Sequence, residues 1–145
     1  MDYRIEEEFL KELKDKYPKL YKTKIWAEFS PGWYPLIKDL SKEIYDLYES
    51  WGDRYETYPF VAQMKEKFGG LRYYMYYGEL TEEDHKKLSE IVDRYERKSY
   101  TICEVCSEQG KNDVNQNLYY RTLCSKCRDE SNARWKKIND THNSN

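Results

Sequence analysis

The chain has 145 residues, which is about the size of one domain, and it combines 36% charged residues with 17% aromatic residues. This aromatic content argues against a disordered polypeptide, because disordered chains are poor in rings. The net charge of −2 argues against strong non-specific attraction to DNA or RNA, and no apolar stretch is long enough to span a bilayer.

The first half of the chain predicts two helices. Residues 4–17 carry an apolar residue at every fourth position, and Pro18 ends this pattern. Residues 19–29 mix basic and apolar side chains and are expected to be extended. Ser30 is expected to cap the next helix, which Gly52 ends. That helix has a wide apolar stripe, formed by Trp33, Leu36, Ile37, Leu40, Ile44, Leu47, Tyr48 and Trp51.

Residues 60–77 predict a β-hairpin, because two β-prone runs meet at Gly69-Gly70, a pair that suits a two-residue turn. That turn would place Lys67 opposite Arg72. One face of the hairpin would then be buried and would hold Phe60, Ala62, Met64, Phe68, Leu71, Tyr73 and Met75. The other face would hold Gln63, Lys65, Lys67, Arg72, Tyr74 and Tyr76.

This second face is the candidate ligand-binding surface. Lys67 opposite Arg72 is a like-charge pair, which either neighbouring carboxylates or a bound anion must offset. Basic side chains beside tyrosines suit phosphate contacts combined with stacking on a base. The alternative interpretation is a solvated face whose lysines keep the sheet soluble and prevent pairing at its edge.

A third helix is predicted to begin at Thr81, because Asp84 stands three residues further on and completes a near capping box. Its buried stripe would consist of Leu88, Ile91, Val92 and Tyr95. The helix leads without a flexible linker into the cysteine-containing region, so the two parts are expected to share a core.

The chain has four cysteines, and they form two Cys-x-x-Cys pairs, Cys103 with Cys106 and Cys124 with Cys127. This spacing predicts one tetrahedral zinc ion, structural rather than catalytic because four sulfurs leave no open coordination position. A treble-clef-like zinc module is expected over residues 100–139. The predicted fold is therefore α+β, with a body over residues 1–99 in which helices pack on a small antiparallel hairpin, the integrated module, and a frayed tail over residues 140–145.

Two other interpretations of the cysteines are a pair of disulfides and a redox-active Cys-x-x-Cys. The first residues do not resemble a signal peptide, so we expect a reducing, cytoplasmic location in which disulfides would not persist. A thioredoxin-like site would need a βαβ pattern, which the sequence lacks.

Three segments carry a resemblance to a known group of proteins. GWYPLI at 32–37, QMKEKFGGLRYY at 63–74, and Cys103-x-x-Cys106 followed by TLCSKC at 122–127 resemble a family of small uncharacterised bacteriophage and prophage proteins. The likeness covers about residues 32–127, and Ser107 departs from it, because the family usually has glycine after the first cysteine pair. The resemblance implies a phage origin, and hence a binder acting on machinery of a bacterial host: a host protein, a nucleic acid or a nucleotide signal of a defence system.

An enzyme is the class with the least support, because His85 and His142 are the only histidines and no Ser-His-acid set or phosphate-cradling loop occurs. The leading expectation is a non-enzymatic binder of an anionic, nucleotide-like ligand or of a host protein on the hairpin face, and a homodimer could join two such faces in one cleft. The alternative is a zinc-finger protein that binds DNA or RNA. Its basic residues would be Lys126, Arg128, Arg134, Lys136 and Lys137 in the last helix.

Overall fold

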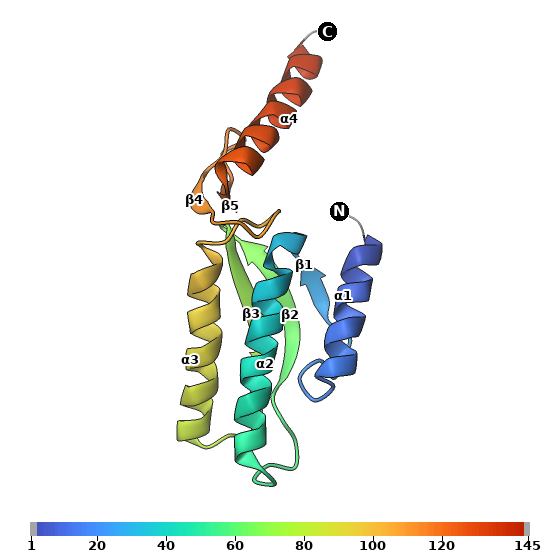
Figure 1. The fold of residues 1–145 in the computed structure, drawn as a ribbon, viewed down its shortest axis with the longest axis vertical. Coiled ribbons are helices and arrows are strands. Elements are labelled where there is room, and N and C mark those ends of the chain that lie inside the picture. The colour runs from blue at the N-terminus through green and yellow to red at the C-terminus, as the bar shows by residue number, and fades with distance from the viewer. Residues whose placement is uncertain (1–2, 144–145) are drawn as a thin grey trace.

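The computed structural model describes the backbone of residues 3–143 and the side chains of residues 6–141. The elements follow one another as α1 (Tyr3–Lys16), β1 (Trp26–Glu28), the 3-10 turn η1 (Pro31–Trp33), α2 (Tyr34–Trp51), β2 (Phe60–Lys67), β3 (Gly70–Tyr76), α3 (Glu82–Ser99), β4 (Lys111–Val114), β5 (Tyr120–Leu123) and α4 (Ser125–Asn143). The α+β class is confirmed. In Figure 1, α2 and α3 lie side by side across a small sheet, and α1 lies beside β1.

The helix boundaries follow local signals with one exception. Helix α1 ends just before Pro18, and Gly52 ends α2 with a positive φ of 58°. The hydroxyl of Thr81 accepts a hydrogen bond from the backbone N–H of Asp84 at 3.1 Å, so the predicted cap of α3 is confirmed. The prediction that Ser30 caps a helix is wrong, because the chain enters α2 through η1 and the Ser30 side chain makes no capping hydrogen bond.

The main sheet has three strands in the order β1-β2-β3. The segment expected to be extended supplies β1, which pairs with β2 in parallel, whereas β2 and β3 form the predicted antiparallel hairpin. The pairing register shifts between Val61 and Gln63, where Ala62 is the extra residue of a bulge. Val61 therefore faces the core, Ala62 is exposed, and Phe60 lies on the opposite face with Tyr76, so the predicted core face is wrong at these three positions.

The turn of the hairpin lies one residue earlier than predicted. Phe68 and Gly69 form it, with φ values of 55° and 79°, and Lys67 pairs with Gly70. Phe68 is consequently 62% exposed instead of buried, and Lys65 rather than Lys67 stands opposite Arg72. The reason is steric: a Cβ on Gly70 would collide with the ring of Tyr100, so Gly70 is needed in the strand and not in the turn.

The core lies between the helices and one face of the sheet. Leu40 and Ile44 of α2 and Leu88 of α3 are fully buried there with Met64 and Leu71 of the hairpin. A polar chain crosses this core. The hydroxyl of Tyr21 lies 2.5 Å from Ser41 Oγ and 2.8 Å from the hydroxyl of Tyr73, and Ser41 in turn donates to the carbonyl of Ile37.

The cysteine-containing module follows α3 directly. It consists of the β4-β5 hairpin and α4, which extends away from the body as an arm in Figure 1. Trp135 and Ile138 on this arm are 40% and 53% exposed. Helix α4 continues through Asn143, so part of the tail expected to fray is helical, while residues 144 and 145 lie outside the described part. None of the helices described is both long and apolar enough to cross a membrane.

Candidate functional site

Two structural features are candidates for function, and the first is the cluster of cysteines. Cys103 and Cys106 lie in the turn after α3, Cys124 follows β5, and Cys127 lies in the first turn of α4. All four sulfur atoms lie within 4.8 Å of one another, and the sulfurs of Cys106 and Cys124 are 3.6 Å apart. The fold thus gathers all the cysteines of the chain at one point.

The sulfur positions fit a metal ion and do not fit disulfides. A tetrahedral ion with metal–sulfur bonds of about 2.3 Å requires sulfur separations of roughly 3.8 Å, whereas a disulfide requires about 2.05 Å. Burial of Cys103 alone would raise its pKa, but backbone N–H groups of Cys124, Cys106 and Val105 donate to the sulfur and lower the pKa to about 7. A thiol that readily becomes a thiolate is a good metal ligand. Burial raises the pKa of Cys127, so the thiols of the cluster differ in how readily they ionise in the absence of a metal ion.

The first Cys-x-x-Cys turn is bound tightly to the start of α2. The backbone N–H of Gly32 donates to the carbonyl of Glu104 at 2.7 Å, and the Ser107 hydroxyl donates to the carbonyl of Gly32 at 2.6 Å. The indole N–H of Trp33 donates to the carbonyl of Ile102 at 3.0 Å. A Cβ on Gly32 would collide with the backbone of Cys103 and Glu104, so only glycine allows this approach.

The module also holds the turn of the main hairpin. Thr122 Oγ1 donates to the carbonyl of Gly69 at 2.6 Å, and Asn112 Nδ2 donates to the carbonyl of Phe68 at 2.9 Å. The carboxylate of Glu104 lies behind this contact and accepts the backbone N–H of Thr122 at 2.7 Å. Burial raises the pKa of Glu104, and the hydrogen bond from Thr122 together with the charge of Arg121 partly offsets this rise. The module that carries the four cysteines therefore also fixes the turn of the main hairpin.

Arg128 was expected to be part of a basic nucleic-acid surface, but the structure places it inside the module. Its guanidinium donates to the carbonyls of Lys111 at 2.7 Å and Arg121 at 3.0 Å, and more weakly to Asp113 and Asn115. It thereby joins both strands of the small hairpin to α4. The other basic residues predicted for this surface, Lys126, Arg134, Lys136 and Lys137, lie on α4 and are exposed.

The second feature is the face of the main sheet that the helices leave uncovered, which we call the open face. It carries all of the predicted ligand-binding residues, Gln63, Lys65, Lys67, Arg72, Tyr74 and Tyr76, because cross-strand partners share a face and alternate residues follow them. The strand pairing adds Trp26 and Glu28 from β1 and Phe60 from β2 to the same face. Trp26, which the sequence analysis did not select, is 64% exposed.

These residues form two rows across the three strands. The first row is Trp26, Gln63 and Tyr74, and the second is Glu28, Lys65 and Arg72. Within the described residues, neither Lys65 nor Arg72 forms an ion pair with a carboxylate, although Glu28 lies in their row. An aromatic row thus lies beside a row with two cations that form no close ion pair among the described residues, although the charge of Arg72 acts on Glu96 and lowers the pKa of that carboxyl.

Towards its turn, the hairpin borders a cavity shared with the module. The cavity has a volume of about 270 Å³ and is lined by Glu66, Lys67, Phe68, Asn117, Tyr119, Tyr120 and Arg121. Tyr119 is 70% exposed and Tyr120 is 49% exposed. Rings and cations therefore continue from the open face into this cavity.

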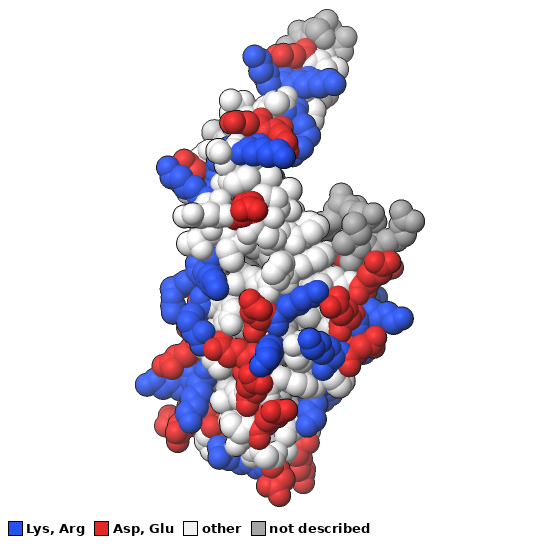
Figure 2. All heavy atoms as spheres, viewed as in Figure 1, with Lys and Arg blue, Asp and Glu red and all other residues white. Residues whose placement is uncertain are grey.

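The helical side of the molecule differs from the open face. Figure 2 shows basic and acidic side chains interspersed over the helices, without a large region of one sign. Several of them are paired, such as Arg94 with Glu43 and Lys38 with Glu12, each at 3.0 Å. His85 lies on this side with its ring 4.4 Å from that of Tyr77.

Comparison of the chain with family models, with curated proteins and with solved structures found no match.

Proposed function

We propose that this protein is a non-enzymatic binding protein, stabilised by a structural zinc ion, whose open face binds an anionic nucleotide-type ligand, specifically a single-stranded oligonucleotide. The observation that carries this proposal is the aromatic row of Trp26 and Tyr74 beside the cation pair of Lys65 and Arg72. Rings stack on bases, and lysine and arginine bind phosphates.

The distribution of these groups favours several nucleotides over one. Trp26 and Tyr74 stand two strands apart, which separates them by roughly 10 Å. Phe60 and Tyr76 add a second ring pair, 5.2 Å apart between centroids, and the cavity near the turn adds Tyr119 and Tyr120. One mononucleotide could reach only a part of this surface, whereas a strand could follow it with its phosphates near the cations.

The net charge of the chain does not oppose this proposal. Single-stranded nucleic acids bind to local basic grooves with stacking platforms, so the charge near the strand matters more than the total. The three cations of the predicted surface, Lys65, Lys67 and Arg72, lie on the sheet, and Glu28 is the acidic residue in the two rows. The opposite surface, which carries mixed charge, would face away from the ligand.

Zinc is the metal that best suits the four sulfurs. Zn²⁺ prefers tetrahedral thiolate sites, and a four-sulfur site has no position left for water or substrate. Two short turns that bear cysteines, a hairpin between them and a helix after them also support the treble-clef-like description of the module. In this proposal the ion fixes the module, and the module in turn fixes the hairpin that presents the open face.

The resemblance to phage proteins suggests that the strand belongs to the phage or to its bacterial host. A nucleotide signal and a host protein are the competing ligands, and direct binding measurements separate them. The probe is a fluorescently labelled oligothymidine of about fifteen nucleotides, which exceeds the site size of most stacking platforms. Fluorescence anisotropy would be measured at several salt concentrations.

The decisive variant is Lys65→Ala combined with Arg72→Ala, and the matched control is Lys86→Ala combined with Lys98→Ala on α3. Each phosphate contact to a single strand contributes about 0.7 to the slope of log affinity against log salt, so the first variant should flatten that slope by ~1.4. The control should bind as the unaltered protein does. Equal binding by both variants, or binding only of mononucleotides, would refute the proposal.

A further inference from the structure

The two edge strands of the main sheet differ in whether side chains hydrogen-bond to their free backbone groups. On the β3 edge, side chains of α3 satisfy the backbone: Leu71 N–H donates to Ser99 Oγ and Tyr73 N–H donates to Glu96 Oε2, each at 2.8 Å. Strand β1 forms the other edge and pairs only with β2. Among the described residues, no side chain makes a hydrogen bond with the backbone of β1. An unprotected edge can accept a further strand.

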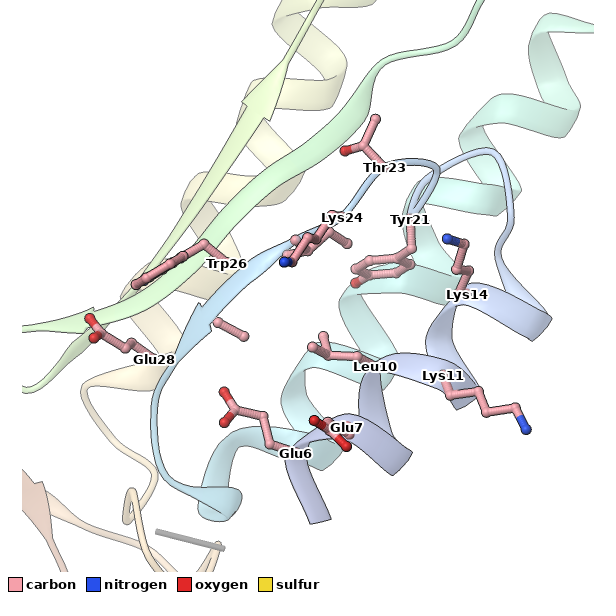
Figure 3. A pocket seen from close by; sticks show the side chains of 12 residues that line it. Glu6, Glu7, Leu10, Lys11, Lys14, Tyr21, Thr23, Lys24, Trp26 and Glu28 are labelled. Carbon is pink, nitrogen blue, oxygen red and sulfur yellow. The ribbon is translucent and has the colours of Figure 1, made fainter. Parts of the chain in front are cut away.

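A groove runs between this free edge and α1. It is a cavity of about 600 Å³ whose lining includes Leu10 of α1 together with Ile25 and Ala27 of the β1 segment. Figure 3 shows the groove from close by, with Leu10 on one side and β1 on the other. An apolar floor between a helix and an open strand edge has the form of a site for an extended peptide.

One residue of the groove, Glu6, has a buried oxygen without a hydrogen-bond partner among the described residues. The side chain of Glu6 is only 7% exposed, and its Oε1 makes no hydrogen bond with any described residue. In Figure 3 its carboxylate points across the groove towards β1. Burial raises the pKa of Glu6, and the nearby charges of Glu28 and Glu7 raise it further. A buried carboxylate oxygen without a hydrogen-bond partner is costly, and a cationic group placed beside it would reduce that cost.

The two ends of the groove carry opposite charge. Glu6, Glu7 and Glu28 gather at the end where β1 finishes. Three lysines also line the groove: Lys11 lies one helical turn after Glu7, and Lys14 and Lys24 stand towards the other end. The residues of the groove therefore select both the charge and the direction of an occupant: a cation at the acidic end, an apolar residue above the floor and an anion near the lysines.

We infer that this groove binds an extended peptide of a partner protein, which adds to the free edge of β1 and directs a lysine or arginine to Glu6. The inference goes beyond the proposed function, because a peptide is a different ligand from a nucleic acid. Trp26 and Glu28 of β1 border both the groove and the open face, whereas Glu6 and Leu10 belong to the groove alone. Main-chain hydrogen bonds to β1 would supply affinity, and the Glu6 contact would supply selectivity.

The test begins with selection of a random heptapeptide library on the full chain. The counter-target is Glu6→Gln, which removes the buried charge and keeps the shape. The matched control is Glu8→Gln, because Glu8 lies on the same helix, is exposed and does not line the groove. We expect enriched peptides to contain lysine or arginine and to bind Glu6→Gln roughly tenfold or more weakly, with unchanged affinity for Glu8→Gln.

A second measurement distinguishes strand addition from simple attraction of charge. Synthetic versions of an enriched peptide would be N-methylated on alternate amides, so that each version blocks one edge of the peptide strand. One version should lose binding and the other should keep it. Failure to enrich any peptide over Glu6→Gln, equal loss from both N-methylated versions, or equally tight binding of butylamine alone would overturn the inference. Thermal unfolding of Glu6→Gln, expected at or above the temperature of the unaltered chain, shows that the variant is folded.

Discussion

The backbone N–H of Gly32 donates to the carbonyl of Glu104 at 2.7 Å, which joins the start of α2 to the first Cys-x-x-Cys turn. Because a Cβ at residue 32 would collide with that turn, we expect Gly32→Ala to lower the free energy of unfolding by ~1–3 kcal/mol, the usual cost of overpacking. Urea unfolding measures the change. Pro31→Ala, at the exposed neighbouring position, is the control and should cost less than about 1 kcal/mol. A Gly32→Ala protein as stable as the unaltered one would show that the contact is loose.

Removal of the metal should loosen more than the module. With Cys103→Ser, or after strong chelation, we expect loss of the bound ion and faster amide exchange both at residues 103–127 and at the hairpin turn, because Thr122 and Asn112 hold that turn. Elemental analysis and hydrogen exchange measure the two effects. Restoring zinc to the chelated protein should restore protection. A metal-free variant with full protection would contradict the structural role of the ion.

The buried hydroxyl chain predicts a stability effect without any change of shape. Tyr21→Phe removes the hydroxyl that lies between Ser41 and Tyr73, leaving both with one partner fewer. The expected loss is ~1–3 kcal/mol, as for other buried polar groups left unsatisfied. Tyr76→Phe is the control, since Tyr76 is 61% exposed, and it should have no measurable effect on chemical denaturation. Equal stability of the two variants would mean that water replaces the lost hydroxyl.

Asp84 predicts a defined pH dependence. Its carboxylate accepts a hydrogen bond from the hydroxyl of Tyr55 and pairs with Arg54 at 2.6 Å, and the Tyr55 hydroxyl contributes most to lowering its pKa. Its contribution to stability is therefore complete above the unfolded pKa of about 4 and is lost as the pH falls through the lower folded pKa. The free energies of unfolding of Asp84→Asn and of the unaltered chain should converge as the pH falls from 6 to about 2.

Asp15→Asn serves as the control for this titration, because Asp15 is exposed on α1. Its stability should follow that of the unaltered chain at every pH. A constant difference between Asp84→Asn and the unaltered chain over the same range would assign the effect of Asp84 to packing rather than to charge.

The local signals in the sequence were sufficient for most elements. Pro18, Gly52 and Thr81 mark boundaries through backbone chemistry that acts within a few residues, and the structure confirms all three. The cysteine spacing predicted the cluster of sulfurs for the same reason, since each Cys-x-x-Cys pair is a local turn. The prediction of a helix cap at Ser30 was wrong because the following Pro31 and Gly32 adopt a 3-10 turn that packs against the module.

The errors in the hairpin arise from contacts between distant segments. Gly69-Gly70 looks like a turn, but Tyr100 requires the second glycine in the strand, and Asn112 binds the carbonyl of Phe68. Similarly, Trp26 joins the open face only through parallel pairing with β2, and nothing near Trp26 in the sequence indicates that pairing. Outside the turn, the predicted faces are correct from Gln63 to Tyr76, because the shifted turn moves the register by two residues. The bulge at Ala62 reverses the faces only for Phe60 and Val61.

The indole N–H of Trp33 donates a hydrogen bond to the carbonyl of Ile102, 69 positions further along the chain. Together with the glycines at 32 and 70, this bond means that the cysteine-containing segment cannot be exchanged as an independent unit between related genes. A recombinant that acquired a different C-terminal segment would need matching changes at the start of α2 and at the turn of the β2-β3 hairpin. These distant stretches must therefore be inherited together.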